Sequence, residues 1–123
     1  KESKMKIAIT AKGKDLESEL DPRFGRAQNY IFYDTELKTF KALSNENIEA
    51  SGGAGTAAAQ IMSKEGIEAV ISGNFGPNAS LGLKAINIKM FTSGTRVVKN
   101  IIEDFLAGKL TEVGEATVPG HQN

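Results

Sequence analysis

The sequence predicts one three-layer α/β domain, in which a mixed five-stranded sheet carries helices on both faces. Short segments rich in β-branched and aromatic residues, each bounded by polar or glycine-containing stretches, indicate the strands. Apolar residues at helical spacing indicate three helices. The order is strand, strand, strand, helix, strand, helix, strand, helix, which predicts an antiparallel meander followed by two crossover units.

The first three strands lie near the start of the chain. In residues 6–10, Ile7 and Ile9 are two positions apart and therefore share one face of a strand. Residues 29–33 are dense in aromatic and branched side chains, and residues 38–43 follow after a short connection. Because that connection is too short for a crossover helix, we expect the second and third strands to form a hairpin.

Two helices enclose a buried strand in the middle of the chain. Residues 55–64 place apolar side chains on one helical face, and Gly66 is positioned to end that helix. Residues 69–72 are almost continuously apolar, which is typical of a strand covered on both faces. Pro77 suits the first turn of the next helix, because proline lacks an N–H that this turn would leave unbonded.

The last strand and helix precede a tail without clear periodicity. Residues 88–91 predict the fifth strand, and Thr95 is placed to cap a helix whose apolar positions recur over residues 97–106. We expect one domain over residues 1–123, with its core at 5–108. Residues 110–123 end in proline, glycine and three polar residues, so we expect a flexible tail there.

Composition limits the function. The 123 residues are 40% hydrophobic and 24% charged, as in a globular domain, and no segment approaches the roughly 18 apolar residues of a membrane span. The start lacks a secretory pattern, so we expect a cytoplasmic protein without membrane partners. Fifteen basic and fifteen acidic residues balance without long runs, which argues against nucleic-acid binding. The absence of cysteine excludes disulfides and thiolate-held metal sites.

A glycine-rich loop at residues 51–56 (SGGAGT) precedes the first predicted helix. Its backbone N–H groups could converge on an anion at the positive end of the helix dipole. The candidate ligand-binding residues are Gly52, Gly53, Gly55 and Thr56. A tight turn with close helix packing explains the glycines equally well. The loop follows the wrong strand for a dinucleotide fingerprint, and it lacks the Gly-Lys-Ser/Thr of a P-loop.

A second loop, residues 73–80 (GNFGPNAS), follows the inner strand directly. Ligands of open α/β sheets sit beyond the carboxyl ends of the strands, so the position favours a binding site. Its candidate ligand-binding residues are Gly73, Asn74, Gly76 and Asn78. These residues offer hydrogen bonds but no general acid, base or nucleophile with a partner, which favours binding over catalysis. A turn that merely starts a helix explains the same residues.

A third loop, residues 21–26 (DPRFGR), places two arginines around an aromatic residue. Arg26 is our candidate for holding an anionic ligand, because guanidinium groups suit anions. The alternative, which we favour slightly, is that Phe24 fills the core while Arg23 and Arg26 are solvated or pair with Asp21.

Three further features carry less weight. Residues 92–95 (TSGT) could join the polar rim, although helix capping by Thr95 explains them. His121 is the single histidine, and we interpret it as a residue of the tail rather than a metal ligand. A Mg²⁺-dependent nuclease of ribonuclease H type would share the predicted strand order but needs carboxylates where Thr10 and Ser72 stand.

Several segments form a family pattern when they are taken in order. They are residues 5–10 (MKIAIT), 24–26 (FGR), 45–47 (NEN), 52–55 (GGAG) and 73–79 (GNFGPNA). The combination resembles the dinitrogenase iron–molybdenum cofactor biosynthesis family, from residue 5 to about residue 108. The resemblance implies a nitrogenase-accessory-like protein with a ribonuclease-H-like fold.

The resemblance also implies binding or shuttling of an iron–molybdenum cofactor or its precursor. Some relatives have cysteine or histidine near the glycine-rich loop, whereas residues 49–55 contain neither here. We therefore expect any iron–molybdenum or iron–sulfur cluster, or oxometalate, to be held by Arg26 and by backbone amides of residues 52–56. Our first hypothesis is a non-enzymatic binding protein, and our second is an interaction module that docks to a metalloprotein partner. A phosphoester hydrolase is the third, and the oligomeric state stays open.

Overall fold

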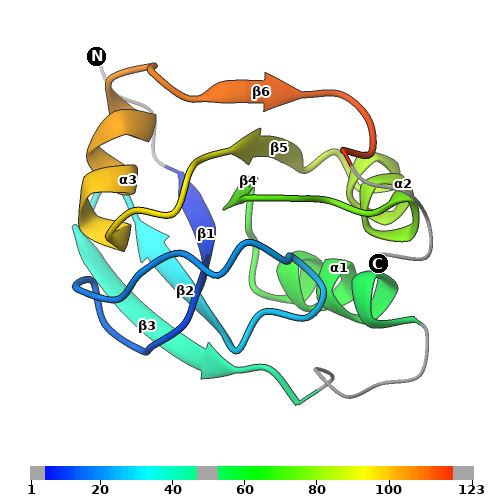
Figure 1. Ribbon diagram of the computed structural model, residues 1–123, viewed down its shortest axis with the longest axis horizontal. Helices are drawn as coiled ribbons and strands as arrows, with labels where there is room; N and C mark the ends of the chain where they lie inside the picture. Colours follow the sequence, from blue (N-terminus) through cyan, green and yellow to red (C-terminus); the bar gives the residue numbers. More distant parts are fainter. Residues whose placement is uncertain (1–4, 47–52, 118–123) are drawn as a thin grey trace.

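The computed structural model describes residues 5–46 and 53–117 (Figure 1). Strands and helices follow the predicted order, with one additional strand at the end. The elements are β1 (Lys6–Ala11), β2 (Asn29–Asp34), β3 (Thr39–Ser44), α1 (Ala54–Lys64), β4 (Ala69–Ser72), α2 (Pro77–Ala85), β5 (Lys89–Thr92), α3 (Val98–Leu106) and β6 (Thr111–Val113). The observed boundaries lie within one or two residues of the predicted ones, which is the usual uncertainty of element ends.

The sheet has six strands in the order β3-β2-β1-β4-β5-β6, whereas the sequence predicted five. β1 pairs antiparallel with β2 and parallel with β4, and β5 is parallel to β4. The sixth strand pairs antiparallel with β5, with Met90 opposite Val113. It lies in the segment that we expected to be a flexible tail. Its three residues are too few to produce a recognisable strand pattern in the sequence.

The predicted hairpin is confirmed. β2 and β3 pair antiparallel along their full length, from Asn29 opposite Ser44 to Asp34 opposite Thr39. The turn between them is closed by the Asp34 side chain, which accepts hydrogen bonds from the N–H groups of Glu36 and Leu37, both at 2.9 Å. An aspartate at this position commonly closes a turn in this way.

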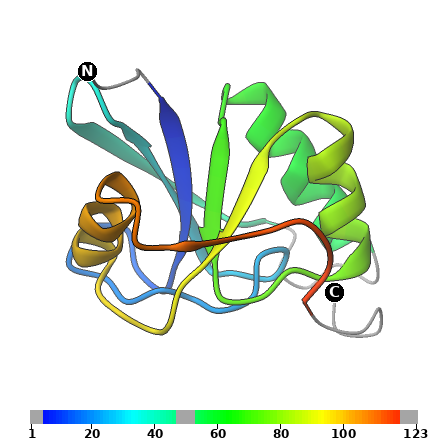
Figure 2. The same cartoon turned by 90° about the horizontal axis from the view of Figure 1, so that it is seen from above.

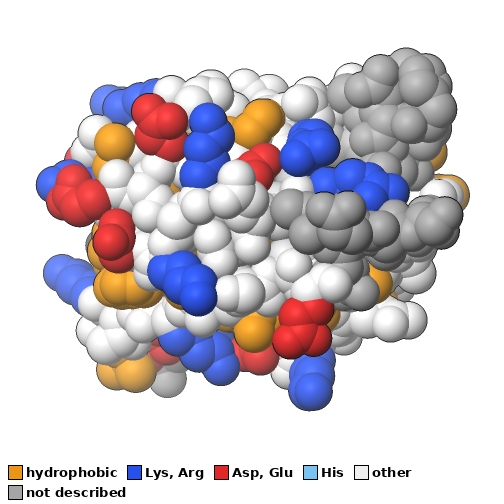
Figure 3. All heavy atoms as spheres, turned by 60° about the horizontal axis from the view of Figure 1, so that its bottom comes forward, with side chains coloured by type: hydrophobic (Ala, Val, Ile, Leu, Met, Phe, Trp, Pro, Cys, Tyr) orange, Lys and Arg blue, Asp and Glu red, His pale blue; other side chains and the backbone are white. Residues whose placement is uncertain are grey.

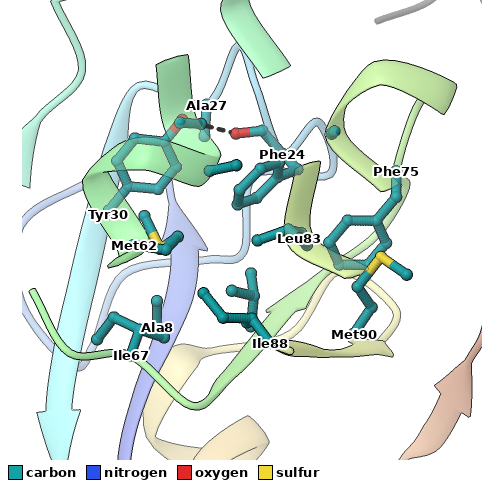
Figure 4. Packing of buried hydrophobic residues seen from close by; sticks show 14 of the residues in the cluster. Ala8, Phe24, Ala27, Tyr30, Met62, Ile67, Phe75, Leu83, Ile88 and Met90 are labelled. Carbon is teal, nitrogen blue, oxygen red and sulfur yellow. Dashed lines mark hydrogen bonds between the residues drawn. The ribbon is translucent and has the colours of Figure 1, made fainter. Parts of the chain in front are cut away.

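Helices cover both faces of the sheet, as predicted. Figure 2 shows α1 and α2 on one side and α3 on the other. Alternation along β1 divides its side chains between the two layers, because successive side chains of a strand point to opposite faces. Ala8 packs in the cluster under α1 and α2, whereas Ile7 and Ile9 pack in the cluster under α3. Figure 4 shows the first cluster, in which Phe24 and Phe75 face each other.

The helix ends agree with the sequence at one position and differ at another. Gly66 has a φ of 73°, the left-handed conformation that ends α1 as predicted. Thr95, however, does not cap α3. The N-cap residue is Val97, which makes no side-chain cap hydrogen bond. Over the described ranges, no helix is long and apolar enough to cross a membrane.

Candidate functional site

The loops that follow β1, β4 and β5 meet at one edge of the sheet (Figure 2). They meet because these three strands are parallel, so that their carboxyl ends lie at the same edge. The loop after β1 runs beside the loop after β4, where Arg23 forms a parallel bridge with Asn74. The N–H of Phe24 donates to the Asn74 carbonyl at 3.3 Å. Two of the three predicted binding loops are therefore in direct contact.

The first turns of α1 and α2 also adjoin at this edge. A Cβ added to Gly55 would lie 2.9 Å from the Cβ of Ala79 and 3.0 Å from its nitrogen. The N-cap residues are Gly53, with a φ of 75°, and Gly76, and neither helix has a side-chain cap or an acidic residue in its first turn. Within the described chain, no side chain of an N-cap residue therefore satisfies the amides that begin these two helices.

The third helix differs at its start. The N–H groups of Val98 and Lys99 donate to the carbonyls of Ser18 at 2.8 Å and Leu16 at 2.9 Å. The loop after β1 therefore occupies the first turn of α3 with backbone acceptors. This contact replaces the capping that we expected from Thr95, and it makes α3 a poor place for a ligand.

Close backbone packing accounts for several of the glycines. A Cβ on Gly25 would lie 2.8 Å from the nitrogen of Gly55, and one on Gly73 would lie 2.8 Å from the Cβ of Pro22. Gly53 is different, because it is exposed and nothing lies within 4 Å of its added Cβ. Close contacts with backbone or Cβ atoms thus explain the glycines at positions 25, 55 and 73, and the positive φ at the start of α1 explains Gly53. Gly52 and its neighbour Ser51 lie outside the described residues.

The DPRFGR segment combines core packing with charge. Phe24 is 1% exposed and packs against Tyr30 and Phe75, as the favoured alternative predicted. The carboxylate of Asp21 accepts hydrogen bonds from the backbone N–H groups of Arg23 and Gln28 rather than serving as a surface charge. Arg23 is exposed.

All three arginines of the chain lie in loops at this edge. Arg23 and Arg26 follow β1, and Arg96 follows β5. Arg96 forms an ion pair with Asp104, whereas Arg23 and Arg26 belong to the loop whose Gly25 contacts the first turn of α1. Arg26 is half-buried, and it follows the glycine that packs on Gly55. Figure 3 shows lysine and arginine side chains in several places on one face of the molecule, with acidic side chains between them. The positive charge on that face is therefore divided into small groups.

Thr10 and Ser72 occupy the strand ends where a ribonuclease H would need carboxylates. Both are completely buried. The Thr10 hydroxyl donates to the carbonyl of Asp21 at 2.6 Å and contacts the Ser72 hydroxyl at 2.9 Å. The Ser72 hydroxyl lies 3.3 Å from the carbonyl of Pro22. These hydroxyls fasten the loop after β1 to the sheet, and they provide no metal-binding oxygen at the surface.

Sequence reasoning missed two contributors to this edge. Tyr30 is buried, and its hydroxyl donates to the Phe24 carbonyl at 2.7 Å (Figure 4). Burial raises the pKa of the Tyr30 phenol, and the nearby Asp21 carboxylate raises it further. Thr117 accepts a hydrogen bond from the Phe75 N–H and donates its own N–H to the Phe75 carbonyl, both at 2.8 Å. The aromatic pattern of β2 could have suggested Tyr30, but no sequence signal pointed to Thr117.

The chemistry of the edge suits an anion held through N–H groups. The described residues contain no group of three or more potential metal-ligating side chains, and the chain has no cysteine. His121 falls outside the described part of the chain. Backbone amides and guanidinium groups donate hydrogen bonds to oxygen or sulfur atoms at the surface of a cluster, whereas they do not coordinate its metals.

These features define a small α/β protein of ribonuclease-H-like topology, with paired helix N-termini at the carboxyl edge of its parallel strands. Residues 5–108 match the family described as dinitrogenase iron–molybdenum cofactor. The chain belongs to that family, as its motifs indicated.

Three relatives illustrate the similarity. The apo form of the orange protein from Desulfovibrio gigas is 32% identical, with a TM-score of 0.88 over 93% of this chain and 97% of that one. A putative NifB protein from Thermotoga is 34% identical, with a TM-score of 0.83 over the same shares. An uncharacterized protein from Methanocaldococcus jannaschii is 29% identical over 109 residues, 86% of this chain and 89% of that protein.

Proposed function

We propose that this chain is a non-enzymatic carrier that binds a small anionic cargo at the carboxyl edge of its parallel strands. The cargo is a metal cluster, an oxometalate or a phosphate-like group. The observation that carries the proposal is the pair of adjoining first turns in α1 and α2, neither of which has a capping side chain among the described residues.

The physics favours an anion at this place. Each helix N-terminus presents unbonded N–H groups and the equivalent of about half a positive charge. Two such termini in contact reinforce each other, and no acidic residue opposes them in either first turn. The guanidinium of Arg26 adds a charged donor, which binds carboxylate-like and phosphate-like oxygens in two-pronged fashion.

The family supports a metal-containing cargo. Its description names the iron–molybdenum cofactor of dinitrogenase. The related orange protein is described in an apo form. For this chain we propose a metal-containing cargo that brings its own sulfur or oxygen ligands. We also propose that a metalloprotein partner receives the cargo at this edge.

The groups at the edge fit binding better than turnover. Asn74 and Asn78 supply side-chain amides, and Ser80 is buried. Amides and guanidinium groups hold an anion without exchanging protons with it near neutral pH. The cargo would therefore be released from the protein in the same chemical form in which it was bound, as a carrier requires.

Calorimetric titration with molybdate and with phosphate, at low and high salt, tests the proposal. Arg26→Ala should weaken binding on the order of tenfold, because a charge-assisted hydrogen bond is lost. Lys89→Ala is the matched control. It removes one positive charge at the start of β5, at the amino ends of the parallel strands and away from the proposed site. At about 0.15 M salt and above it should change the affinity by less than about twofold, because exposed charges farther apart than a Debye length of roughly 8 Å are screened. Equal effects of the two substitutions, or no binding of either anion, would contradict the proposal.

Anaerobic gel filtration with an isolated iron–molybdenum cluster tests the identity of the cargo. Molybdenum and iron should elute with the wild-type protein and be depleted from the Arg26→Ala fraction. Retention that is insensitive to Arg26 would point to nonspecific adsorption and would refute the cluster as cargo.

A further inference from the structure

Asn45 binds the backbone on both sides of Arg26. This asparagine follows β3 directly and is 7% exposed. Its side-chain Nδ2 donates to the carbonyl of Ala27 at 2.8 Å and to that of Gly25 at 3.1 Å. Its backbone N–H donates to the carbonyl of Gln28 at 3.0 Å. A single residue thus holds three carbonyls of the loop that carries the proposed anion-binding arginine.

Tyr30 extends this arrangement to a fourth carbonyl. The Tyr30 hydroxyl donates to the carbonyl of Phe24 at 2.7 Å (Figure 4). It also lies 3.3 Å from Nδ2 of Asn45, whose two hydrogens are shared among this hydroxyl and the carbonyls of Ala27 and Gly25. Tyr30 is completely buried, so both side chains are fixed by their surroundings. Buried polar groups that are mutually hydrogen-bonded specify one conformation, because any alternative leaves a polar atom without a partner.

The loop that is held in this way contacts the first turn of α1. The backbone of Gly25 packs on the nitrogen of Gly55 in the first turn of α1. Arg26 is the next residue, so holding the peptides on both sides of it fixes its Cα relative to that turn. An arginine loses much conformational freedom on binding, and a fixed starting point reduces the loss.

We infer that Asn45 is the positioning residue for Arg26, and that it acts through the carbonyls of Gly25 and Ala27 rather than by contact with the cargo. The inference rests on the proposed function, in which Arg26 holds the anion. Removal of the Asn45 amide releases the loop, and the guanidinium then has to be ordered each time an anion binds.

A double-mutant cycle with molybdate tests this inference. Asn45→Ala should weaken binding on the order of tenfold in the wild-type background, which is comparable to Arg26→Ala. In the Arg26→Ala background it should change the affinity by less than about twofold, because residues that act through one another are not additive. Asn29→Ala is the matched control. Asn29 is equally buried, at 7% exposed, but its Nδ2 donates to the carbonyl of Lys12.

The outcomes separate the two proposals. If the losses from Asn45→Ala and Arg26→Ala multiply in the double variant, or if Asn29→Ala weakens binding as much, Asn45 does not act through Arg26 and the inference fails. If Arg26→Ala has no effect while molybdate still binds, the proposed function fails at that residue.

Nitrogen-15 relaxation of the free protein tests the positioning without any ligand. The backbone amide of Arg26 should become more mobile on the picosecond to nanosecond timescale in Asn45→Ala, whereas Asn29→Ala should leave it unchanged. Tyr30→Phe, which keeps the ring and removes only the hydroxyl, should give a smaller increase and serves if Asn45→Ala does not fold. An unchanged Arg26 amide in both Asn45→Ala and Tyr30→Phe would overturn the inference, whether or not an anion binds.

Discussion

Gly25 lies so close to Gly55 that a Cβ on Gly25 would be 2.8 Å from the nitrogen of Gly55 and 2.9 Å from its Cα. Real Cβ atoms essentially never approach backbone atoms so closely. The contact joins the loop after β1 to the first turn of α1, two segments that lie about thirty positions apart in the sequence. Together with Gly55 on Ala79, it brings three segments of the edge into one packed unit.

Gly25→Ala should therefore push the loop away from α1. Overpacking against backbone, which cannot yield as a flexible side chain does, should lower the free energy of unfolding by about 1 to 3 kcal/mol. Urea unfolding measures this loss. Gly94→Ala is the control, because nothing lies within 4 Å of the Cβ it adds and Gly94 has no positive φ. A Gly25→Ala protein as stable as the Gly94→Ala protein would contradict the close approach.

Thr10→Val removes a buried hydroxyl while keeping a branched side chain. The carbonyl of Asp21 loses a donor at 2.6 Å, and the Ser72 hydroxyl loses its neighbour. We expect a loss of about 1 to 3 kcal/mol in the free energy of unfolding, because the buried carbonyl of Asp21 loses its hydroxyl donor, while the Ser72 hydroxyl keeps the carbonyl of Pro22. Thr39→Val at the exposed start of β3 should stay within about 0.5 kcal/mol. Similar results for the two variants would show that the hydroxyl contacts contribute no stability.

The raised pKa of the Tyr30 phenol should make the folded protein less stable at high pH. The neutral phenol donates a hydrogen bond to the backbone carbonyl of Phe24. Burial raises the pKa of that phenol above the ordinary value of about 10. Above that pH the unfolded chain loses a proton that the folded protein retains, so folding becomes less favourable as the pH rises. The contribution of Tyr30 to the free energy of unfolding is fully present below about pH 10. Above that pH it declines by at most about 1.4 kcal/mol per pH unit.

Urea unfolding of wild type and Tyr30→Phe between about pH 9 and pH 11 isolates this contribution. Tyr30→Phe should be less stable near neutral pH, because it lacks the bond to Phe24, and its stability should fall less steeply above about pH 10. Parallel pH profiles would mean that the folded-state pKa of Tyr30 is not raised.

Thr117→Val should loosen the segment that follows β6. The N–H of the buried Phe75 loses its acceptor, while the second bond between the two backbones remains. We expect a loss of about 1 kcal/mol, seen as roughly fivefold faster hydrogen exchange at the Phe75 amide. Thr111→Val is the control, because Thr111 is an exposed threonine at the start of β6. Unchanged exchange at Phe75 would indicate that the Thr117 contact is transient.

Local patterns were enough to predict most of the fold. Alternation predicted that Ile7 and Ile9 share a layer, and the glycine after the first helix predicted where α1 ends. The two crossover units predicted from the order of strands and helices require β1, β4 and β5 to run parallel, as they do. These features depend on neighbouring residues and on the order of the elements, so sequence reasoning reached them.

The remaining features depend on contacts between distant residues. Thr117 and Phe75 are 42 positions apart, and their pairing turns part of an expected tail into an ordered segment. Thr95 has the chemistry of a cap, but the carbonyls of Leu16 and Ser18 already occupy the first turn of α3. The close contact of Gly25 with Gly55 could likewise not be inferred from either motif alone. In each case the decisive partner is set by tertiary packing, which a local pattern does not contain.

A titration of the nitrogen-15-labelled protein with molybdate, followed by amide chemical shifts, tests the central claim most directly. The amides of the α1 and α2 first turns should shift in proportion to the bound fraction. They are those of Gly55, Thr56, Asn78 and Ala79. The amides of Val98 and Lys99 should stay in place, because backbone carbonyls already bind them. Equal shifts at α3, or no shifts at α1 and α2 under saturating molybdate, would contradict a paired helix N-terminal anion site.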